Sequence, residues 1–109
     1  MGAKLVAKLR KHFNVLNPFE RERGLTYRQI VQKDLELIRK SDLLVAWLPF
    51  PSVGTSMEIL YAKSNGIPVY IITSELKSHP WIRFYANKIF ETYEELENYL
   101  VNLYYGKSK

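Results

Sequence analysis

The sequence predicts an α/β fold of three layers, in which helices cover both faces of a mostly parallel sheet. Two segments, Leu43–Leu48 and Pro68–Thr73, are apolar without alternation, which is typical of strands that are buried on both faces. Apolar residues at helical spacing lie on either side of both segments. Strands that alternate with helices of about 10 to 15 residues indicate βαβ units, and hence parallel strands.

The first forty residues are expected to hold two helices and a short strand. Ala3–Phe13 has the spacing of an amphipathic helix whose lysines face water. Asn14–Leu16 is expected to be a short strand, ended by an Asn-Pro pair. Thr26 is expected to cap a helix that runs to about Lys40.

The rest of the chain continues this alternation. The remaining expected elements are a helix at Thr55–Asn65, a helical turn at Trp81–Ala86, a strand at Lys88–Phe90 and a helix from Thr92 to Gly106. Gly66 supplies the left-handed residue that ends the first of these helices. Thr92 and Glu95 have the spacing of a capping box, which marks the start of the last helix.

The composition of the 109 residues indicates one soluble domain, residues 1–109. The absence of cysteine excludes disulfides, thiolate metal sites and a cysteine nucleophile. Two histidines make a zinc site unexpected, and we expect no cofactor. Apolar runs are far shorter than the roughly 20 residues that span a bilayer, and no signal-peptide pattern is present. We therefore expect a cytoplasmic protein without a membrane partner.

Charge is distributed unevenly along the chain. Residues 1–40 hold ten Lys or Arg and four Asp or Glu, a balance of +6, whereas residues 41–109 have a balance of −1. A basic half can meet nucleic acid or a phosphorylated small molecule. Because no nucleic-acid readout motif is present, we favour a solvated basic surface and do not expect nucleic acid as the partner.

The turn after the first buried strand is the first candidate site. Ligands of open α/β sheets bind outside the carboxyl ends of the strands, and free N–H groups at a helix N-terminus attract anions. Ser52, Gly54, Thr55 and Ser56 are therefore a candidate anion cradle. A tight strand-to-helix turn without a ligand would select similar residues.

Glu58 and Asp34 are the two candidate acids. Glu58 has the spacing of a capping box with Thr55, so its position is explained equally well by helix capping or by a carboxylate in the crevice. Asp34 lies on an apolar helical stripe between Ile30 and Ile38, and must face the protein body. A buried carboxylate needs a hydrogen bond, a cation or a proton, and on the residues alone we favour a structural role for it.

Several segments together resemble a known family in their order and spacing. Asp34–Asp42, the strand after it, Pro51–Gly54, Met57–Ala62 and Gly66–Val69 resemble the nucleoside 2-deoxyribosyltransferase superfamily. Within it, the resemblance is closest to the 2′-deoxynucleoside 5′-monophosphate N-glycosidases. It covers roughly residues 30–73 and implies a flavodoxin-like or Rossmann-like sheet.

The resemblance implies a role for each candidate. Glu58 would attack the anomeric carbon of the sugar, release the base and form a glycosyl-enzyme ester, which water or a second base resolves. Asp34 matches the acid that orients or protonates the leaving base. Transferases of free nucleosides tend to have an acid at the position of Ser52. A neutral serine there suits a 5′-phosphate, which a carboxylate would repel. Ser78 matches a serine that reaches the phosphate from a neighbouring subunit, so a homodimer is implied.

One departure from the family pattern concerns the start of the sheet. The family's first strand and its glycine-containing loop have no counterpart before Ala3, so we expect a sheet without the usual first strand. A start site placed too late in the given sequence, or a sheet completed by another chain, would account for the missing strand. The expected function is hydrolysis of the N-glycosidic bond of nucleoside or deoxynucleoside 5′-monophosphates, with Glu58 as the nucleophile. The alternatives are a nucleoside 2-deoxyribosyltransferase, or a nucleotide-binding module without catalysis.

Overall fold

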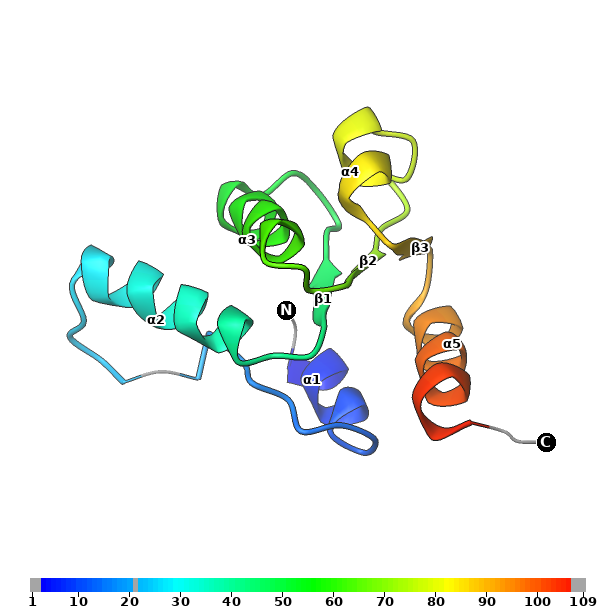
Figure 1. Ribbon diagram of the computed structural model, residues 1–109, viewed down its shortest axis with the longest axis horizontal. Coiled ribbons are helices and arrows are strands. Elements are labelled where there is room, and N and C mark those ends of the chain that lie inside the picture. Colours follow the sequence, from blue (N-terminus) through cyan, green and yellow to red (C-terminus); the bar gives the residue numbers. More distant parts are fainter. Residues whose placement is uncertain (1–2, 21, 107–109) are drawn as a thin grey trace.

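The computed structural model describes residues 3–20 and 22–106 as an α/β arrangement (Figure 1). Along these residues the elements are α1 (Ala3–Leu9), α2 (Tyr27–Arg39), β1 (Leu44–Trp47), α3 (Val53–Ser64), β2 (Val69–Ile72), α4 (Pro80–Tyr85), β3 (Lys88–Phe90) and α5 (Tyr93–Tyr105). None of the helices in these ranges is both long enough and apolar enough to cross a bilayer.

The sheet of the described residues has three strands in the order β1-β2-β3, and both pairs are parallel. Leu44 lies opposite Val69 at the start of the first pair, and Ile72 lies opposite Phe90 at the end of the second. The expected parallel sheet is thus confirmed. The first two strands are the expected apolar runs, each shorter by one residue at either end, and β3 has the expected bounds.

Helices cover the sheet on both faces, which confirms the three layers. Successive residues of β2 alternate between two core clusters, because strand side chains point to opposite faces. Val69 and Ile71 pack with residues of α2, α3 and α4, whereas Tyr70 and Ile72 pack with residues of α1 and α5. In Figure 1, α3 and α4 accordingly lie above the strands and α1 and α5 lie below them.

Three of the expected helix ends have the capping residues that the sequence predicts. Thr26 caps α2, and its capping box is completed by Gln29. Thr92 and Glu95 form the expected capping box of α5. Gly66 follows α3 with a φ of 73°, a left-handed conformation that glycine adopts without strain.

The structure of residues 3–16 differs from the expectation. The α1 helix ends at Leu9, not at Phe13, and Asn14–Leu16 does not form a strand. Tertiary contacts override the local helical spacing here. His12 Nε2 lies 2.8 Å from Glu97 Oε2 of α5, and the Phe13 ring packs edge-on against Tyr104, with centroids 6.2 Å apart.

The start of α3 also differs. The helix begins at Val53, and Ser52 is its cap, so the expected start at Thr55 is wrong by two residues. The Ser52 side chain accepts a hydrogen bond from the Thr55 N–H, and Thr55 is therefore the third residue of the helix. Serine is as good a cap as threonine, and Ser52 has the extended backbone that a cap requires, with φ −141° and ψ 125°.

Candidate functional site

A groove with a volume of about 490 Å³ runs along β1 and past its carboxyl end. We call it the β1 groove. It is lined by β1 itself, by the carboxyl half of α2, by the start of α3, by residues 13–19 and by two side chains of α5. Five of the expected site residues lie on its wall: Asp34, Ser52, Gly54, Thr55 and Glu58.

The carboxyl end of β1 is held in place by a buried threonine. Thr73 is 2 % exposed and follows β2 directly. Its hydroxyl donates to the Leu48 carbonyl at 2.6 Å and accepts from the Leu76 N–H at 3.1 Å. The ends of the two neighbouring strands are thereby tied together, at the position where parallel sheets bind ligands.

The N-terminus of α3 opens toward this end of the groove. The Ser52 hydroxyl accepts from the Thr55 N–H at 3.3 Å and lies 3.2 Å from the Thr55 hydroxyl. The Ser56 N–H donates to the Ser52 carbonyl. Val53 and Gly54 are the first two residues of α3, and the first N–H groups of a helix have no acceptor within it. Two donors at the positive end of a 12-residue helix form a favourable seat for an anion.

The start of α3 shows that Glu58 is not part of a capping box. A capping box places the acid at the third helical position, which here is Thr55. Glu58 is the sixth residue of α3, so capping does not account for it. Its side chain is half-buried and lines the β1 groove. Of the two explanations that the sequence left open for Glu58, only the carboxylate in the crevice agrees with this geometry.

Asp34 reaches the same groove from α2. It is half-buried, and the buried Ile38 one turn further packs into the core beneath it. A hydrogen bond joins α2 to α3 near their carboxyl ends, where Arg39 Nη1 donates to the Tyr61 hydroxyl at 2.8 Å. The sequence-based expectation that position 34 faces the protein body is confirmed.

Two other expected residues lie elsewhere. Ser56 is exposed on α3, and Ser78 is exposed in the loop before α4. Neither is among the described residues that line the groove. A chain on its own therefore does not bring Ser78 to the other five.

The structure also adds groove residues that the sequence did not indicate. Phe13, Asn14 and Asn17 line it from the irregular segment after α1, and Tyr104 lines it from α5. Their nearness to β1 depends on how distant segments pack, for which a sequence pattern gives no signal. Trp47 also lines the groove and is 45 % exposed, so it is not a core residue.

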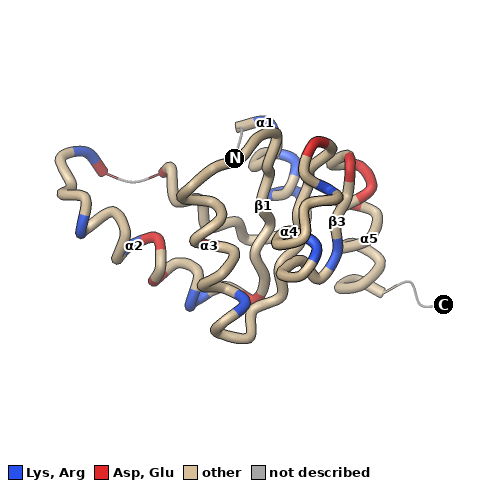
Figure 2. Tube along the Cα trace, turned by 90° about the horizontal axis from the view of Figure 1, so that it is seen from above, with Lys and Arg blue, Asp and Glu red and all other residues tan. Residues whose placement is uncertain are grey.

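Figure 2 shows the lysines and arginines of the described residues spread over several elements, with acidic residues near the start of α5. Some pair with each other, as Lys77 does with Glu91. This distribution agrees with a solvated basic surface.

Comparison with known proteins identifies the family of the chain. A family model described as nucleoside 2-deoxyribosyltransferase matches residues 1–104. The chain belongs to the nucleoside 2-deoxyribosyltransferase family. This match extends well beyond the segments on which the sequence resemblance was noticed, and includes α1 and α5.

Two individual proteins are similar to this family member. A Thermofilum pendens protein, provisionally named 2′-deoxynucleoside 5′-phosphate N-hydrolase 1, is 40% identical over 48 residues, or 44% of this chain. The matched segment spans 34% of that relative, about a third of its length. The Clostridium botulinum CMP N-glycosidase BcmB has the same fold, with a TM-score of 0.66 and 24% identity. The superposition covers 93% of this chain and 88% of that one.

Proposed function

We propose that the protein hydrolyses the N-glycosidic bond of deoxynucleoside 5′-monophosphates. The observation that carries this proposal is the joint position of Glu58 and Asp34 on one groove, beside the N-terminus of α3. Membership of the family supports sugar-to-base chemistry. The names of the two similar proteins, one a nucleoside 5′-phosphate hydrolase and the other a CMP N-glycosidase, support a phosphorylated substrate.

In the proposed first step, the Glu58 carboxylate attacks the anomeric carbon of the sugar. The bond from that carbon to the base breaks, and its electron pair leaves with the base. A protonated Asp34 gives the base its proton, so the products are the free base and a sugar ester of Glu58. Water then attacks the same carbon, gives its proton to the Asp34 carboxylate and releases sugar 5-phosphate and Glu58.

The 5′-phosphate would bind at the start of α3. The N–H groups of Val53 and Gly54 and the Ser52 hydroxyl donate to its oxygens, and the helix dipole favours its charge. Ser78 is proposed to reach the same phosphate from a second subunit, because its own loop lies away from the groove. The active form would then be a homodimer.

Transfer to a second base is the alternative reaction, and the description of the family supports it. Both reactions share the first step and differ only in what attacks the ester. An incubation that supplies a free base together with the nucleotide separates them, because transfer yields a new nucleotide and hydrolysis yields sugar phosphate.

The test is an assay of base release. The enzyme is incubated with each of the four deoxynucleoside monophosphates and with CMP, and the free base is measured by chromatography. Glu58→Ala should lower turnover more than about 1,000-fold, and Asp34→Asn about 100-fold or more. Glu36→Gln is the matched control, because Glu36 is an exposed acid on the same helix as Asp34. Wild-type turnover in Glu58→Ala would rule out the proposed nucleophile.

A further inference from the structure

Trp47 is the last residue of β1, at the end of the strand where the candidate site lies. Its backbone is fixed, because it lies opposite Ile72 in the sheet and is followed by the buried Leu48, whose N–H and C=O are both hydrogen-bonded. The indole itself is 45 % exposed and lines the β1 groove. A large aromatic side chain on a rigid backbone is therefore accessible from the groove.

Three other aromatic residues line the groove, and their settings differ from that of Trp47. Phe13 and Tyr104 pack edge-on against each other, with ring centroids 6.2 Å apart. Phe19 lies in the irregular segment after α1 and not on the sheet. The Trp47 indole makes no ring contact or hydrogen bond with the other residues that the structure describes. Trp47 thus combines an unpaired ring with a fixed backbone.

Trp47 faces the candidate acids from the other side of the groove. Side chains alternate along β1. Ala46 packs with residues of α2 and α3, whereas Val45 packs against the cluster of α1 and α5, so Trp47 points to the same side as Val45. Asp34 and Glu58 reach the groove from α2 and α3. A molecule in the groove can therefore meet the two carboxylates with one part and the indole with another.

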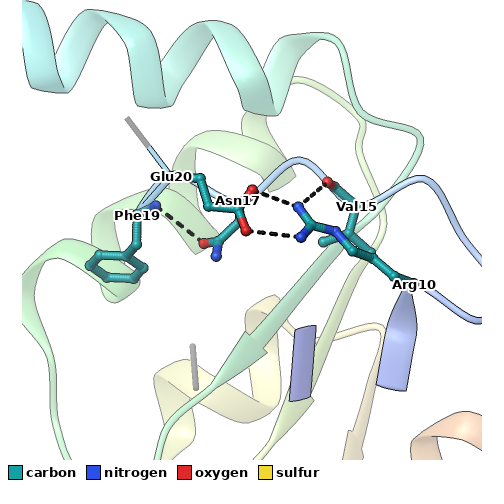
Figure 3. A network of polar contacts seen from close by, with 5 residues as sticks. All are labelled: Arg10, Val15, Asn17, Phe19 and Glu20. Carbon is teal, nitrogen blue, oxygen red and sulfur yellow. Dashed lines mark hydrogen bonds and ion pairs between the residues drawn. The ribbon is translucent and has the colours of Figure 1, made fainter. Parts of the chain in front are cut away.

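The segment after α1 forms a wall on the side that Trp47 faces, and Arg10 holds it in place (Figure 3). The Arg10 guanidinium donates to both carboxylate oxygens of Glu20, at 2.9 and 2.6 Å, and to the Val15 carbonyl at 3.2 Å. Val15 packs against the cluster of α1 and α5. Because these contacts lie within the chain, the wall is formed before any ligand binds, which lowers the entropy cost of binding.

We propose that Trp47 is the surface on which the base of the nucleotide stacks, an inference that rests on the proposed function. The sugar would lie beside Glu58, and the base would extend from it onto the indole, with its edge toward Asp34. Every base has a π-face, so stacking on an aromatic side chain does not depend on the edge groups of the base. Trp47 would thus select a nucleotide over a sugar phosphate without reading one particular base. Purines would bind more tightly than pyrimidines, because a larger ring covers more of the indole.

Trp47 fluorescence is a direct readout, since the chain has two tryptophans and Trp81→Phe leaves Trp47 alone. Trp81 is exposed on α4, outside the groove. Titrations use Glu58→Gln in this background, so that the nucleotide stays intact. dGMP should quench the Trp47 emission, whereas deoxyribose 5-phosphate, which has no base, should leave it unchanged. Isothermal titration calorimetry measures the dissociation constant of each compound.

Trp47→Leu and Trp47→Phe, each in the Glu58→Gln protein, form the matched pair of variants. Leucine keeps an apolar side chain but has no ring face, whereas phenylalanine keeps a smaller one. Trp47→Leu should weaken binding of dGMP about 10- to 100-fold and of dCMP by a smaller factor, and Trp47→Phe should recover most of the loss. Deoxyribose 5-phosphate should bind both variants as tightly as the parent, because it does not reach the indole.

Three results would overturn the proposal. The first is an absence of quenching by dGMP, and the second is an unchanged affinity for dGMP in Trp47→Leu. The third is an equal loss of affinity for dGMP and for deoxyribose 5-phosphate, because the substitution would then act on the groove as a whole. These measurements do not depend on turnover. Wild-type protein that binds dGMP in this way but releases no base would contradict the proposed reaction and leave the stacking role of Trp47 intact.

Discussion

At the scale of single residues, the cap of α3 is the most consequential feature. Ser52 takes the capping position, and this places Glu58 in the second turn of the helix, beyond the reach of a capping box. The same cap leaves the Val53 and Gly54 N–H groups directed out of the helix. One serine therefore sets both the proposed phosphate seat and the position of the proposed nucleophile.

Substitution of Ser52 separates its two roles. Ser52→Asp preserves a good cap, so the midpoint of urea unfolding should stay close to wild type. It places a carboxylate at the proposed phosphate seat, and kcat/KM for nucleoside monophosphates should fall at least about tenfold through repulsion. Ser52→Ala is the companion variant and should lose about 1 kcal/mol of stability. Unchanged kcat/KM in Ser52→Asp would exclude a phosphate at this helix end.

Tyr70 provides a prediction for alkaline pH. Burial, with a smaller contribution from nearby Tyr104, raises the pKa of Tyr70 to about 12. The folded state then holds the proton more tightly than the unfolded state, whose tyrosine pKa is about 10. Stability should therefore fall as the pH rises from about 10 to about 12. Urea titrations across this range should show a shallower fall for Tyr70→Phe, with Tyr27→Phe, at an exposed position, as the control.

At the scale of elements, the strands and most helix ends could be predicted from local sequence. Continuous apolar runs mark β1 and β2, because both faces of these strands are covered. Thr26 and Thr92 mark the starts of α2 and α5 through side-chain bonds within four residues. The strand expected at Asn14–Leu16 was wrong for a physical reason. A strand exists only through its partner, and here the Val15 carbonyl bonds to Arg10 instead.

The joint between β1 and β2 is testable at this scale. Thr73→Val keeps the shape of the side chain but removes the hydroxyl that bonds Leu48 and Leu76. The buried Leu48 carbonyl and the half-buried Leu76 N–H lose this partner, so the free energy of unfolding should fall by about 1 to 3 kcal/mol. Urea denaturation measures this, and Ser74→Ala, at the next and exposed position, should change stability by less than about 0.5 kcal/mol. Equal stability of both variants would mean that water replaces the threonine hydroxyl.

At the scale of the whole molecule, the candidate site arises from the parallel order of the sheet. Parallel strands bring their carboxyl ends to one edge, and α2 and α3 flank that edge on the face they share. Spacing and the family resemblance could therefore predict that Asp34, Ser52 and Glu58 lie on one groove. They could not predict the wall that Asn14 and Tyr104 form, because that wall depends on packing between the two ends of the chain.

The proposed glycosyl ester of Glu58 is the central claim of this account. The most direct measurement is mass spectrometry of peptides from the wild-type enzyme, quenched with acid within milliseconds of mixing with a deoxynucleoside monophosphate. The account predicts a deoxyribose 5-phosphate adduct on the peptide that contains Glu58, and its absence in Glu58→Gln. Rapid base release with no adduct, or an adduct at another residue, would contradict the claim.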